Sequence, residues 1–366
     1  MPSSQIGAHK QQLDTPILCI DLDRMEANIK KISGYCHRHG LQWRPHQKCH
    51  KTPAIALKQL NAGAIGVTCA KVSEAEVMAA AGVRDILIAN MIVGEQKWQR
   101  IAALCRHADP IVACDNIEQV RPLADICRQH GVAVRVILEI NIGLDRVGVN
   151  PGPDTLALTK LVNSLDGVRF AGIMGYEGHL LQISEPEEKE RLIRKSIQIL
   201  ADSTKQIQDA GISCGIVSAG GTGSYHYTAQ CPGVTELQAG GGIFMDRFYR
   251  ENCQVKELEY ALTVLATVVS RPTPTRAVLD TGRKTMSPEA GMPIVVGHED
   301  ATVTRLSAEH CEITLATKSQ GLSIGDKLEL IVGYGDYTSF LHDEFHGFRG
   351  DFLEVVWPIL GRGKLQ

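Results

Sequence analysis

The chain has 366 residues, of which 44% are apolar and 22% are charged, and its formal net charge at pH 7 is -3. This composition supports a large core in one or two domains and excludes a disordered or fibrous protein. No apolar stretch reaches the roughly 18 residues of a membrane span, and no charge run predicts binding to nucleic acid or to a membrane. The first residues lack the apolar segment of a signal peptide, so we do not expect export.

The eleven cysteines are scattered along the chain and form no C-x-x-C pair. Several of them lie inside apolar stretches, among them Cys69 and Cys114. This pattern fits neither a disulfide framework nor a zinc site with four ligands. We therefore expect reduced thiols in the core of a cytoplasmic protein.

From about residue 16 to residue 244, short apolar runs alternate with amphipathic segments. Runs that are apolar on both faces and separated by helices are typical of buried parallel strands. The predicted strands are residues 17–22, 41–47, 64–70, 85–90, 111–115, 133–141, 168–176, 215–221 and 236–244. The clearest predicted helices are residues 52–63, 73–82, 116–131 and 186–211. About eight such units over roughly 230 residues predict a (β/α)8 barrel, which needs about 250. The alternative, a doubly wound open sheet, is disfavoured because no G-x-G-x-x-G follows the first strand.

After about Cys253 the pattern changes to β-branched runs that are broken by Gly and Pro, without a long helix. The predicted strands lie within residues 260–280, 292–297, 301–317 and 326–334. We therefore predict an α/β chain with an N-terminal (β/α)8 barrel over residues 16–252. Residues 253–366, together with residues 1–15, are predicted to form a mostly β domain.

The stretch RPHQKCHKTP, which begins at Arg44, carries the strongest chemical signal. Lys48 follows the second apolar run, where barrel enzymes carry catalytic side chains. Arg44, His46, His50 and Lys51 would lower the pKa of Lys48, and a neutral amine is the form that attacks an aldehyde. The sequence thus predicts a lysine that forms a Schiff base, and a solvated basic turn is the alternative.

Two glycine-rich loops follow later strands, SAGGTGSY at residues 218–225 and LQAGGG at residues 237–242. Such loops offer backbone amides to a phosphate, and barrels commonly bind phosphate after their last strands. Combined with a poised lysine, they indicate pyridoxal 5'-phosphate as the cofactor. The candidate cofactor-binding residues in these loops are Ser218, Gly221, Thr222, Gly223, Gln238, Gly240 and Gly241.

Two further strand ends carry polar groups. Arg146, in NIGLDRVGV, could neutralise the phenolic oxygen of the cofactor, or it could be an ordinary surface arginine. In MGYEGHL, Tyr176 is a candidate cofactor contact, and Glu177 and His179 form a candidate acid–base pair. A packed tyrosine and a surface histidine are the alternative. The candidate catalytic residues are Lys48, His179 and His50.

Several motifs along the chain resemble those of one enzyme family. RPHQKCHK resembles the R-P-H-x-K-T-H-K motif of fold-type III pyridoxal phosphate enzymes, the group of D-threonine aldolase and eukaryotic-type D-serine dehydratase. NIGLDRVGV, GYEGHL, SAGGTGSY, ELQAGGGIFMD and LDTGRKTMSPEAGMPIV follow in the same order. The resemblance implies a barrel similar to that of alanine racemase, a C-terminal β domain and a homodimer whose active site is shared between subunits. It also implies that Lys48 holds the cofactor and that Lys51 supports it.

The chain departs from this family where metal-using members carry H-x-C or H-x-D before an L-H-D segment. In VGYGDYTSFLHDEFH, Tyr334 replaces the histidine, and Asp336 is the remaining candidate metal ligand. A phenol is a poor replacement for imidazole at a zinc or manganese site. His342 and His346 are nearby, but their spacing is not that of the family. We therefore expect no tightly bound zinc, and a weaker divalent site for manganese or magnesium stays an alternative.

Two smaller departures are Asn141, where the family carries Asp, and Gly242, where it often carries Tyr. The second change leaves room beside the phosphate or a gap that is filled from elsewhere. Without a metal ion, a protein acid or base must act on the β-hydroxyl of the substrate, and His179 and His310 are candidates.

The leading hypothesis is a lyase that acts on β-hydroxy D-amino acids, by aldol cleavage or by elimination as in D-serine or 3-hydroxyaspartate dehydratases. We favour the aldolase because the weakened metal site removes the Lewis acid that helps hydroxide to leave. An amino-acid racemase or epimerase is the alternative. A non-catalytic pyridoxal phosphate-binding protein is disfavoured by the β domain, and a sugar-phosphate aldolase would have no cofactor absorbance.

Overall fold

The computed structural model describes residues 5–366, which divide into two compact units. One unit combines the chain up to Lys31 with Gly241–Arg362. The other unit comprises Ile32–Gly240 and Gly363–Gln366. Each unit is described below by itself.

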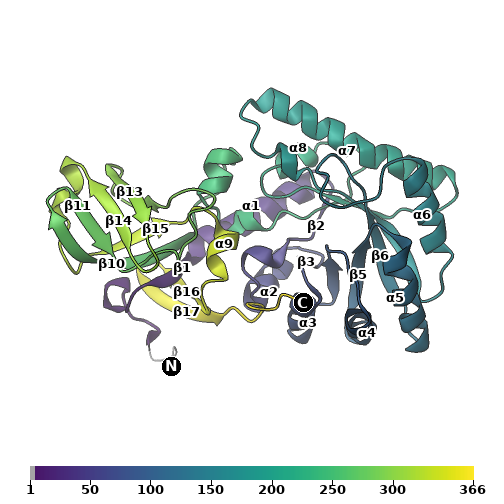
Figure 1. Ribbon diagram of the computed structural model, residues 1–366, viewed down its shortest axis with the longest axis horizontal. Coiled ribbons are helices and arrows are strands. Elements are labelled where there is room, and N and C mark those ends of the chain that lie inside the picture. Colours follow the sequence, from purple (N-terminus) through teal and green to yellow (C-terminus); the bar gives the residue numbers. More distant parts are fainter. Residues whose placement is uncertain (1–4) are drawn as a thin grey trace. The chain divides into compact units, whose positions relative to one another are not determined.

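Eight parallel strands form the sheet of the second unit, in the order β2-β9-β8-β7-β6-β5-β4-β3. Figure 1 labels β2, β3, β5 and β6 of this sheet. Their bounds are β2 Gln42–Trp43, β3 Val67–Cys69, β4 Asp85–Ile88, β5 Asp109–Cys114, β6 Val134–Glu139, β7 Val168–Met174, β8 Ile216–Ala219 and β9 Glu236–Leu237. The segment after β2 also meets β3, because His46 bridges Thr68 and the Ile65 amide donates to the Trp43 carbonyl at 2.9 Å. The ends of the sheet are thus joined, and the predicted (β/α)8 barrel is confirmed.

Helices alternate with these strands, as the sequence pattern requires. Their bounds are α2 Pro53–Asn61, α3 Val72–Ala80, α4 Glu95–Leu104, α5 Ile117–Gln129, α6 Pro153–Asn163, α7 Pro186–Asp209 and α8 Tyr225–Thr228, with α1 Leu22–Arg38 before β2. The capping box at Asn116 shows how local sequence sets a helix start: its side chain accepts from the Glu118 amide at 3.0 Å. The four predicted helices are all present.

The strands of this unit are buried because both of their faces are apolar. One cluster combines side chains from four neighbouring strands, β4 to β7: Leu87, Ile111, Ala113, Ile137 and Met174. Burial of such side chains contributes about 1.5–3 kcal/mol each for the larger ones. The polar strand ends are therefore displayed on a rigid scaffold.

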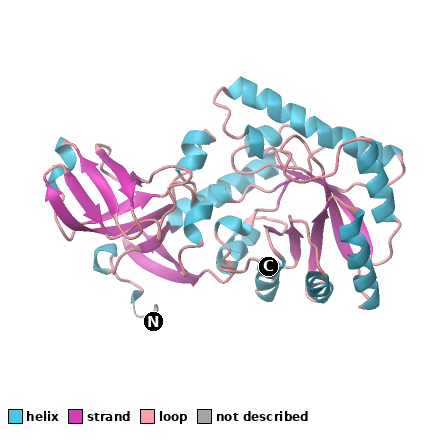
Figure 2. Cartoon of the chain, in the orientation of Figure 1, coloured by secondary structure: helices cyan, strands magenta, loops and turns pink. Residues whose placement is uncertain are grey.

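The first unit is built on a mixed nine-stranded sheet, and Figure 2 shows strands as its main component. The main path of the sheet runs β13-β14-β11-β10-β1-β16-β17, and β15 pairs with β10 and β12. The bounds are β1 Ile17–Asp21, β10 Leu262–Thr273, β11 Arg276–Leu279, β12 Ile294–Val295, β13 Ala301–Leu306, β14 Cys311–Leu315, β15 Lys327–Ile331, β16 Glu344–Arg349 and β17 Phe352–Pro358, with α9 Gly335–Ser339. The predicted C-terminal β domain is confirmed.

One predicted strand lies in the other sheet. We expected residues 17–22 to open the barrel, but β1 pairs antiparallel with β10 and parallel with β16. A short apolar run before a helix looks the same in both settings, so only the available partner strands decide. The predicted domain bounds, 16–252 and 253–366, differ from the bounds of the two units given above and stay a prediction.

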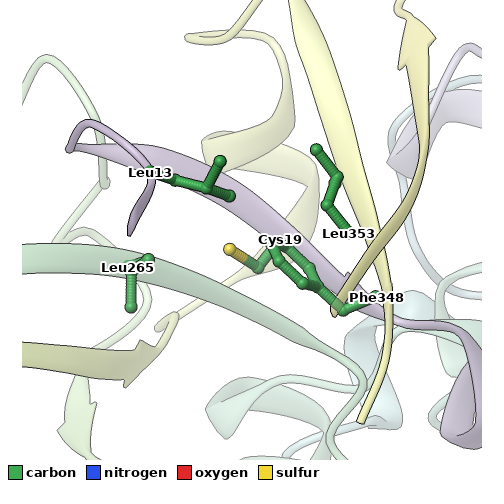
Figure 3. Close-up of a cluster of buried hydrophobic side chains, with 5 residues drawn as sticks. All are labelled: Leu13, Cys19, Leu265, Phe348 and Leu353. Atoms are coloured by element: carbon green, nitrogen blue, oxygen red, sulfur yellow. The ribbon is translucent and has the colours of Figure 1, made fainter. Parts of the chain in front are cut away.

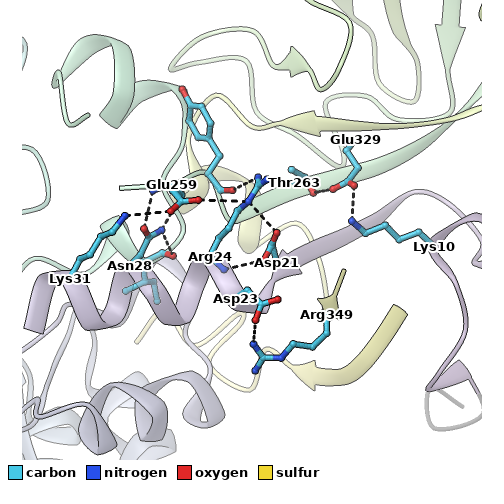
Figure 4. A network of polar contacts seen from close by, with 12 residues as sticks. Lys10, Asp21, Asp23, Arg24, Asn28, Lys31, Glu259, Thr263, Glu329 and Arg349 are labelled. Atoms are coloured by element: carbon cyan, nitrogen blue, oxygen red, sulfur yellow. Dashed lines mark hydrogen bonds and ion pairs between the residues drawn. The ribbon is translucent and has the colours of Figure 1, made fainter. Parts of the chain in front are cut away.

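The pairing of β1 is fixed by packing and by polar contacts within the first unit. Leu13, Cys19, Leu265, Phe348 and Leu353 form one buried cluster (Figure 3). In a second region (Figure 4), the buried side-chain amide of Asn28 donates to the Glu259 carbonyl at 2.7 Å and accepts from the Glu259 amide at 2.9 Å. These contacts attach the first segment of the chain to the strands that follow residue 241.

All eleven cysteines are free thiols, and all of them except Cys105 are buried. Burial raises the pKa of Cys36 and Cys311 to about 12, so both are protonated at neutral pH. Within residues 5–366, no helix combines the length and the apolar character that crossing a bilayer requires.

Candidate active site

Lys48 lies in the short 3-10 helix η3 Gln47–Cys49, which follows β2. The backbone amide of Lys48 donates to Nδ1 of His46 at 3.3 Å, and His46 bridges Thr68 beside β3. The lysine side chain is half-buried. The carboxyl end of a barrel strand therefore presents Lys48, as the sequence predicted.

The positive charges around Lys48 act on one histidine. Burial holds the pKa of His46 well below its usual value, and the charges of Lys48, Lys51 and Arg146 lower it further. His46 is therefore neutral, while the two lysines and Arg146 lie near one another. A lysine amine at a strand end is the type of group that attacks an aldehyde carbon.

Lys51 forms an ion pair with an acidic side chain. Its Nζ contacts the carboxylate of Glu74, which is buried and also accepts from the Ala70 amide at 2.7 Å. The backbone of Lys51 has a φ of 50°, in the left-handed region that is uncommon for a lysine. Lys51 therefore supports the loop after β2 through this ion pair.

Arg44 has a different role from the one that we expected. It is 1% exposed, its Nε donates to Glu236 at 3.0 Å, and its NH1 donates to Asp85 at 2.6 Å. Burial opposes the charge of Arg44, but the two carboxylates outweigh burial and raise its pKa. Because this charge is compensated inside the barrel, the expectation that Arg44 lowers the pKa of Lys48 loses its basis.

His50 is completely buried, and its Nδ1 accepts a hydrogen bond from the Thr52 amide at 3.0 Å. Burial lowers its pKa to about 3. A histidine with this pKa is neutral throughout the physiological range and is a poor proton donor there. The structure therefore favours His50 as a residue that positions the turn from Lys51 into α2.

Arg146 and Tyr176 come together beside the ends of β6 and β7. The guanidinium carbon of Arg146 lies 5.8 Å from the centre of the Tyr176 ring, and its NH2 lies 3.5 Å from Oε1 of Glu139. Burial raises the pKa of Glu139, and the charge of Arg146 opposes that shift. A Cβ atom at Gly221 would lie 2.9 Å from the Tyr176 ring, so the first glycine loop passes directly against this ring.

The other two polar residues of GYEGHL diverge. Glu177 is fully buried and accepts a hydrogen bond from the hydroxyl of Thr228. His179 is exposed, and its Nε2 is 2.9 Å from the position of a Cβ atom at Gly143, in the loop after β6. The structure therefore does not bring Glu177 and His179 together as an acid–base pair, and His179 stays a candidate by itself.

The two glycine loops are joined by a hydrogen bond in which Nε2 of Gln238 donates to Oγ of Ser218 at 2.9 Å. A Cβ atom at Gly240 would overlap the backbone of His46, so only glycine fits where this loop passes the η3 segment. Among the described residues, no hydrogen bond of the Gly223 or Gly240 amide is formed. These amides are therefore suited to an anionic ligand.

Gly241 belongs to the first unit, where Tyr249 lies against it. A Cβ atom at Gly241 would lie 2.8 Å from the Tyr249 hydroxyl oxygen. Tyr249 lies in the π-helix Phe248–Asn252, outside the sequence motifs described above, so no local pattern pointed to it. Its ring occupies space beside the glycine loop, where the change at Gly242 predicted room.

The candidate metal site holds a phenol and a carboxylate. The Tyr334 hydroxyl donates to Oδ2 of Asp336 at 3.0 Å. His342 is engaged elsewhere, since its Nε2 lies 2.9 Å from the Thr285 carbonyl oxygen, and burial lowers its pKa. Over residues 5–366, no three His, Cys, Asp or Glu side chains gather as metal ligands. This donor set does not fit a tight zinc site, which takes three or four ligands from Cys, His, Asp or Glu.

Comparison with known proteins identifies the family. The model "Alanine racemase, N-terminal domain" matches residues 20–247, and "Putative serine dehydratase domain" matches residues 261–348. D-threonine aldolase of Arthrobacter sp is 37% identical, over 99% of this chain and 96% of the relative. The chain belongs to the D-threonine aldolase and D-serine dehydratase family. It is therefore a pyridoxal phosphate-dependent lyase with the alanine racemase-like fold.

Solved structures of the family have the same architecture. The crystal structure of D-threonine aldolase from Filomicrobium marinum matches with a TM-score of 0.96 and 35% identity, over 99% of this chain and 98% of that chain. A cysteine-to-alanine variant of D-threo-3-hydroxyaspartate dehydratase in its metal-free form matches with a TM-score of 0.85 and 27% identity, over 96% of this chain and 98% of that one.

The barrel residues fit the cofactor of this family. Lys48 supplies an amine among like charges, and the glycine loops supply amides that suit a phosphate. Sequence reasoning missed the acidic partners Glu74, Glu139 and Glu236, because their partners come from other strands and loops. A glutamate at the first residue or the last residue of a strand is the one signal that could have found Glu236 and Glu139.

Proposed function

We propose that this lyase cleaves β-hydroxy D-amino acids between Cα and Cβ and releases glycine and an aldehyde. The observation that carries the proposal is Lys48 at the carboxyl end of β2, among cations and beside two glycine loops, in a chain that matches D-threonine aldolase over nearly its whole length. Aldol cleavage is favoured over elimination because Tyr334 and Asp336 do not supply the ligands of a Lewis acid that would assist the departure of hydroxide.

Each candidate residue has a proposed role. Lys48 would bind the aldehyde carbon of the cofactor, and Arg146 would neutralise its phenolic oxygen. The first glycine loop, with Ser218, would hold the phosphate through backbone amides and hydroxyls. The Tyr176 ring, fixed between Gly178 and Gly221, would limit movement of the cofactor ring.

The bound cofactor supplies an electron sink for the negative charge that develops at Cα. The residues of the chain would orient the cofactor and the substrate. Arg146 would direct its guanidinium at the phenolic oxygen of the cofactor, and Glu139, whose Oε1 lies 3.5 Å from NH2 of Arg146, would help to orient it. His46 contributes no charge, because burial and its cationic neighbours keep it neutral. His179, exposed at the end of β7, stays a candidate for returning a proton to Cα.

The test combines spectroscopy with product analysis. The purified protein should show the visible absorbance of lysine-bound pyridoxal phosphate, and it should release an aldehyde from D-threonine and D-phenylserine. Lys48→Ala should lose both properties, because no amine remains to bind the aldehyde carbon. Lys195→Ala is the matched control, since Lys195 is exposed on α7. A protein that forms oxo acid and ammonia would be a dehydratase, and exchange of the Cα proton without other products would indicate a racemase.

We also propose that the protein is a cytoplasmic homodimer that binds neither nucleic acid nor membranes. The family resemblance supports the dimer, and the net charge of -3 without basic runs supports the absence of these partners. Light scattering should give twice the mass of one chain. A monomer with full activity would contradict a shared active site.

A further inference from the structure

The loop after β6, residues 141–149, carries Arg146 and is closed at its base by the backbone. The Asn141 amide donates to the Val149 carbonyl at 3.0 Å. Beyond this base, Asp145 and Arg146 are exposed, so burial does not fix their place. The direction in which the loop presents Arg146 therefore depends on contacts inside the loop.

One side-chain amide forms three hydrogen bonds inside this loop. Oδ1 of Asn141 accepts from the Gly143 amide at 3.0 Å and from the Asp145 amide at 3.3 Å. Nδ2 of Asn141 donates to Oδ1 of Asp145 at 2.7 Å. Asp145 has a φ of 54°, in the left-handed region that is uncommon for residues other than glycine. Asn141 therefore holds the residue before Arg146 in a conformation that the backbone alone disfavours.

The side-chain bond between Asn141 and Asp145 requires a donor on one of the two residues. An ionised carboxylate only accepts hydrogen bonds, whereas an amide both donates and accepts them. Asn141→Asp would place two carboxylates at hydrogen-bond distance, so repulsion would replace attraction. A second change, Asp145→Asn, would restore the bond in the reverse direction. This reciprocity separates the bond itself from the size and charge of either residue.

The same loop meets two candidate site residues of the barrel. Arg146 directly follows the bonded aspartate, and its guanidinium carbon lies 5.8 Å from the centre of the Tyr176 ring. Nε2 of His179 is 2.9 Å from the position of a Cβ atom at Gly143, whose amide donates to Asn141. The hydrogen bonds of one amide thus connect the segment that carries Arg146 with the segment that lies against His179.

We propose that Asn141 is a positioning residue of the active site, which fixes, through its bond to Asp145, the loop that directs Arg146 at the cofactor. The inference rests on the role of Arg146 in the proposed function and adds the contact that sets it. Asn141 acts through the backbone of the loop. A guanidinium near the phenolic oxygen of the cofactor favours the ionised form of that oxygen. The absorbance spectrum of the bound cofactor therefore reports the position of Arg146.

Two measurements on the full-length protein test the inference, and neither requires turnover. Trypsin cleaves after arginine, so the rate of cleavage between Arg146 and Val147, with and without pyridoxal phosphate, reports how often the loop opens. Absorbance titration with pyridoxal phosphate gives the affinity for the cofactor and the spectrum of its bound form. The melting temperature shows whether each variant stays folded.

The variants are Asn141→Asp, Asp145→Asn and the double variant that carries both changes. Asn141→Asp removes the donor and adds a like charge, whereas Asp145→Asn leaves an acceptor for Asn141. The double variant has one amide and one carboxylate, as the wild type has. Asn150→Asp is the matched control, because Nδ2 of Asn150 also donates to an aspartate four residues later, Oδ2 of Asp154 at 3.2 Å, but outside the loop.

We expect Asn141→Asp to speed cleavage after Arg146 and to weaken pyridoxal phosphate binding by about tenfold each, the effect of losing one hydrogen bond to a charged group. The visible band of the bound cofactor should also change in this variant. The double variant should return the cleavage rate and the affinity to within about threefold of the wild type, because the bond is restored. Asp145→Asn and Asn150→Asp should stay within about threefold, as changes that keep the loop bonded do.

Wild-type cleavage and cofactor affinity in Asn141→Asp would overturn the inference, and so would a double variant that behaves like Asn141→Asp alone. Faster cleavage with unchanged cofactor affinity and spectrum would also overturn it, because the order of the loop would then not act on the cofactor site. If the wild-type protein binds pyridoxal phosphate but releases no aldehyde from D-threonine or D-phenylserine, the proposed cleavage alone fails, since the loop and cofactor measurements do not depend on turnover.

Discussion

Replacing Arg44 by methionine tests how the barrel holds the lysine segment. The change removes the bonds of Arg44 to Glu236 and Asp85. Asp85 is 32% exposed and keeps a second partner, since Arg135 donates to it at 2.6 Å. Glu236 is 3% exposed, and among the described residues Arg44 makes all of its side-chain hydrogen bonds. The substitution therefore leaves one buried carboxylate without a counter-charge.

Breaking a buried ion pair in this way costs about 3–5 kcal/mol. Arg100→Met gives a matched comparison, because Arg100 also binds a carboxylate through two nitrogens, but the pair with Glu76 is 31% and 38% exposed. An exposed pair contributes about 0–1 kcal/mol. The double variant Arg44→Met with Glu236→Met removes both charges and should recover most of the lost stability.

Urea unfolding of the cofactor-saturated protein, followed by circular dichroism, measures these differences from the midpoints and the shared slope. We expect the destabilisation of Arg44→Met to exceed that of Arg100→Met by at least about 2 kcal/mol. Equal effects of the two substitutions would refute the reasoning. A double variant that is as unstable as Arg44→Met alone would show that shape, rather than the unpaired carboxylate, sets the cost.

Two further predictions concern the same segment. The folded-state pKa of His50 is about 3, below its usual value of about 6.5, so its contribution to stability is complete above pH 6.5 and is lost as the pH falls towards 3. Melting temperatures between pH 5 and pH 7.5 (a window of roughly that width around the usual histidine pKa) should fall less steeply in His50→Gln, and parallel curves would contradict this. Gly240→Ala forces a Cβ atom into the backbone of His46 and should weaken pyridoxal phosphate binding about tenfold or more, as measured by absorbance titration. Gly215→Ala is the control, since the nearest atom to its Cβ position is 3.8 Å away, and equal affinities of the two variants would argue against a role of Gly240 in the cofactor site.

The sequence by itself determined the barrel and the place of Lys48. Buried parallel strands need apolar residues on both faces, and helices need caps, so both leave periodic signals that can be counted along the chain. Lys48 follows from the end of one such run. The glycine loops at residues 218–225 and 237–242 follow in the same way from local composition.

Tertiary structure decided the partners. β1 lies in the mixed sheet because β10 and β16 offer matching edges, and no local pattern specifies an edge that lies more than two hundred residues away. Arg44 became a buried structural ion because Glu236 and Asp85, from two other strands, converge on it. Within one unit, side-chain packing places Tyr249 against Gly241 and brings the Tyr334 hydroxyl into hydrogen-bond distance of Asp336. Residue type and spacing predict which polar groups lie at the end of a strand. The contacts that each group forms depend on neighbours that only the folded chain brings together.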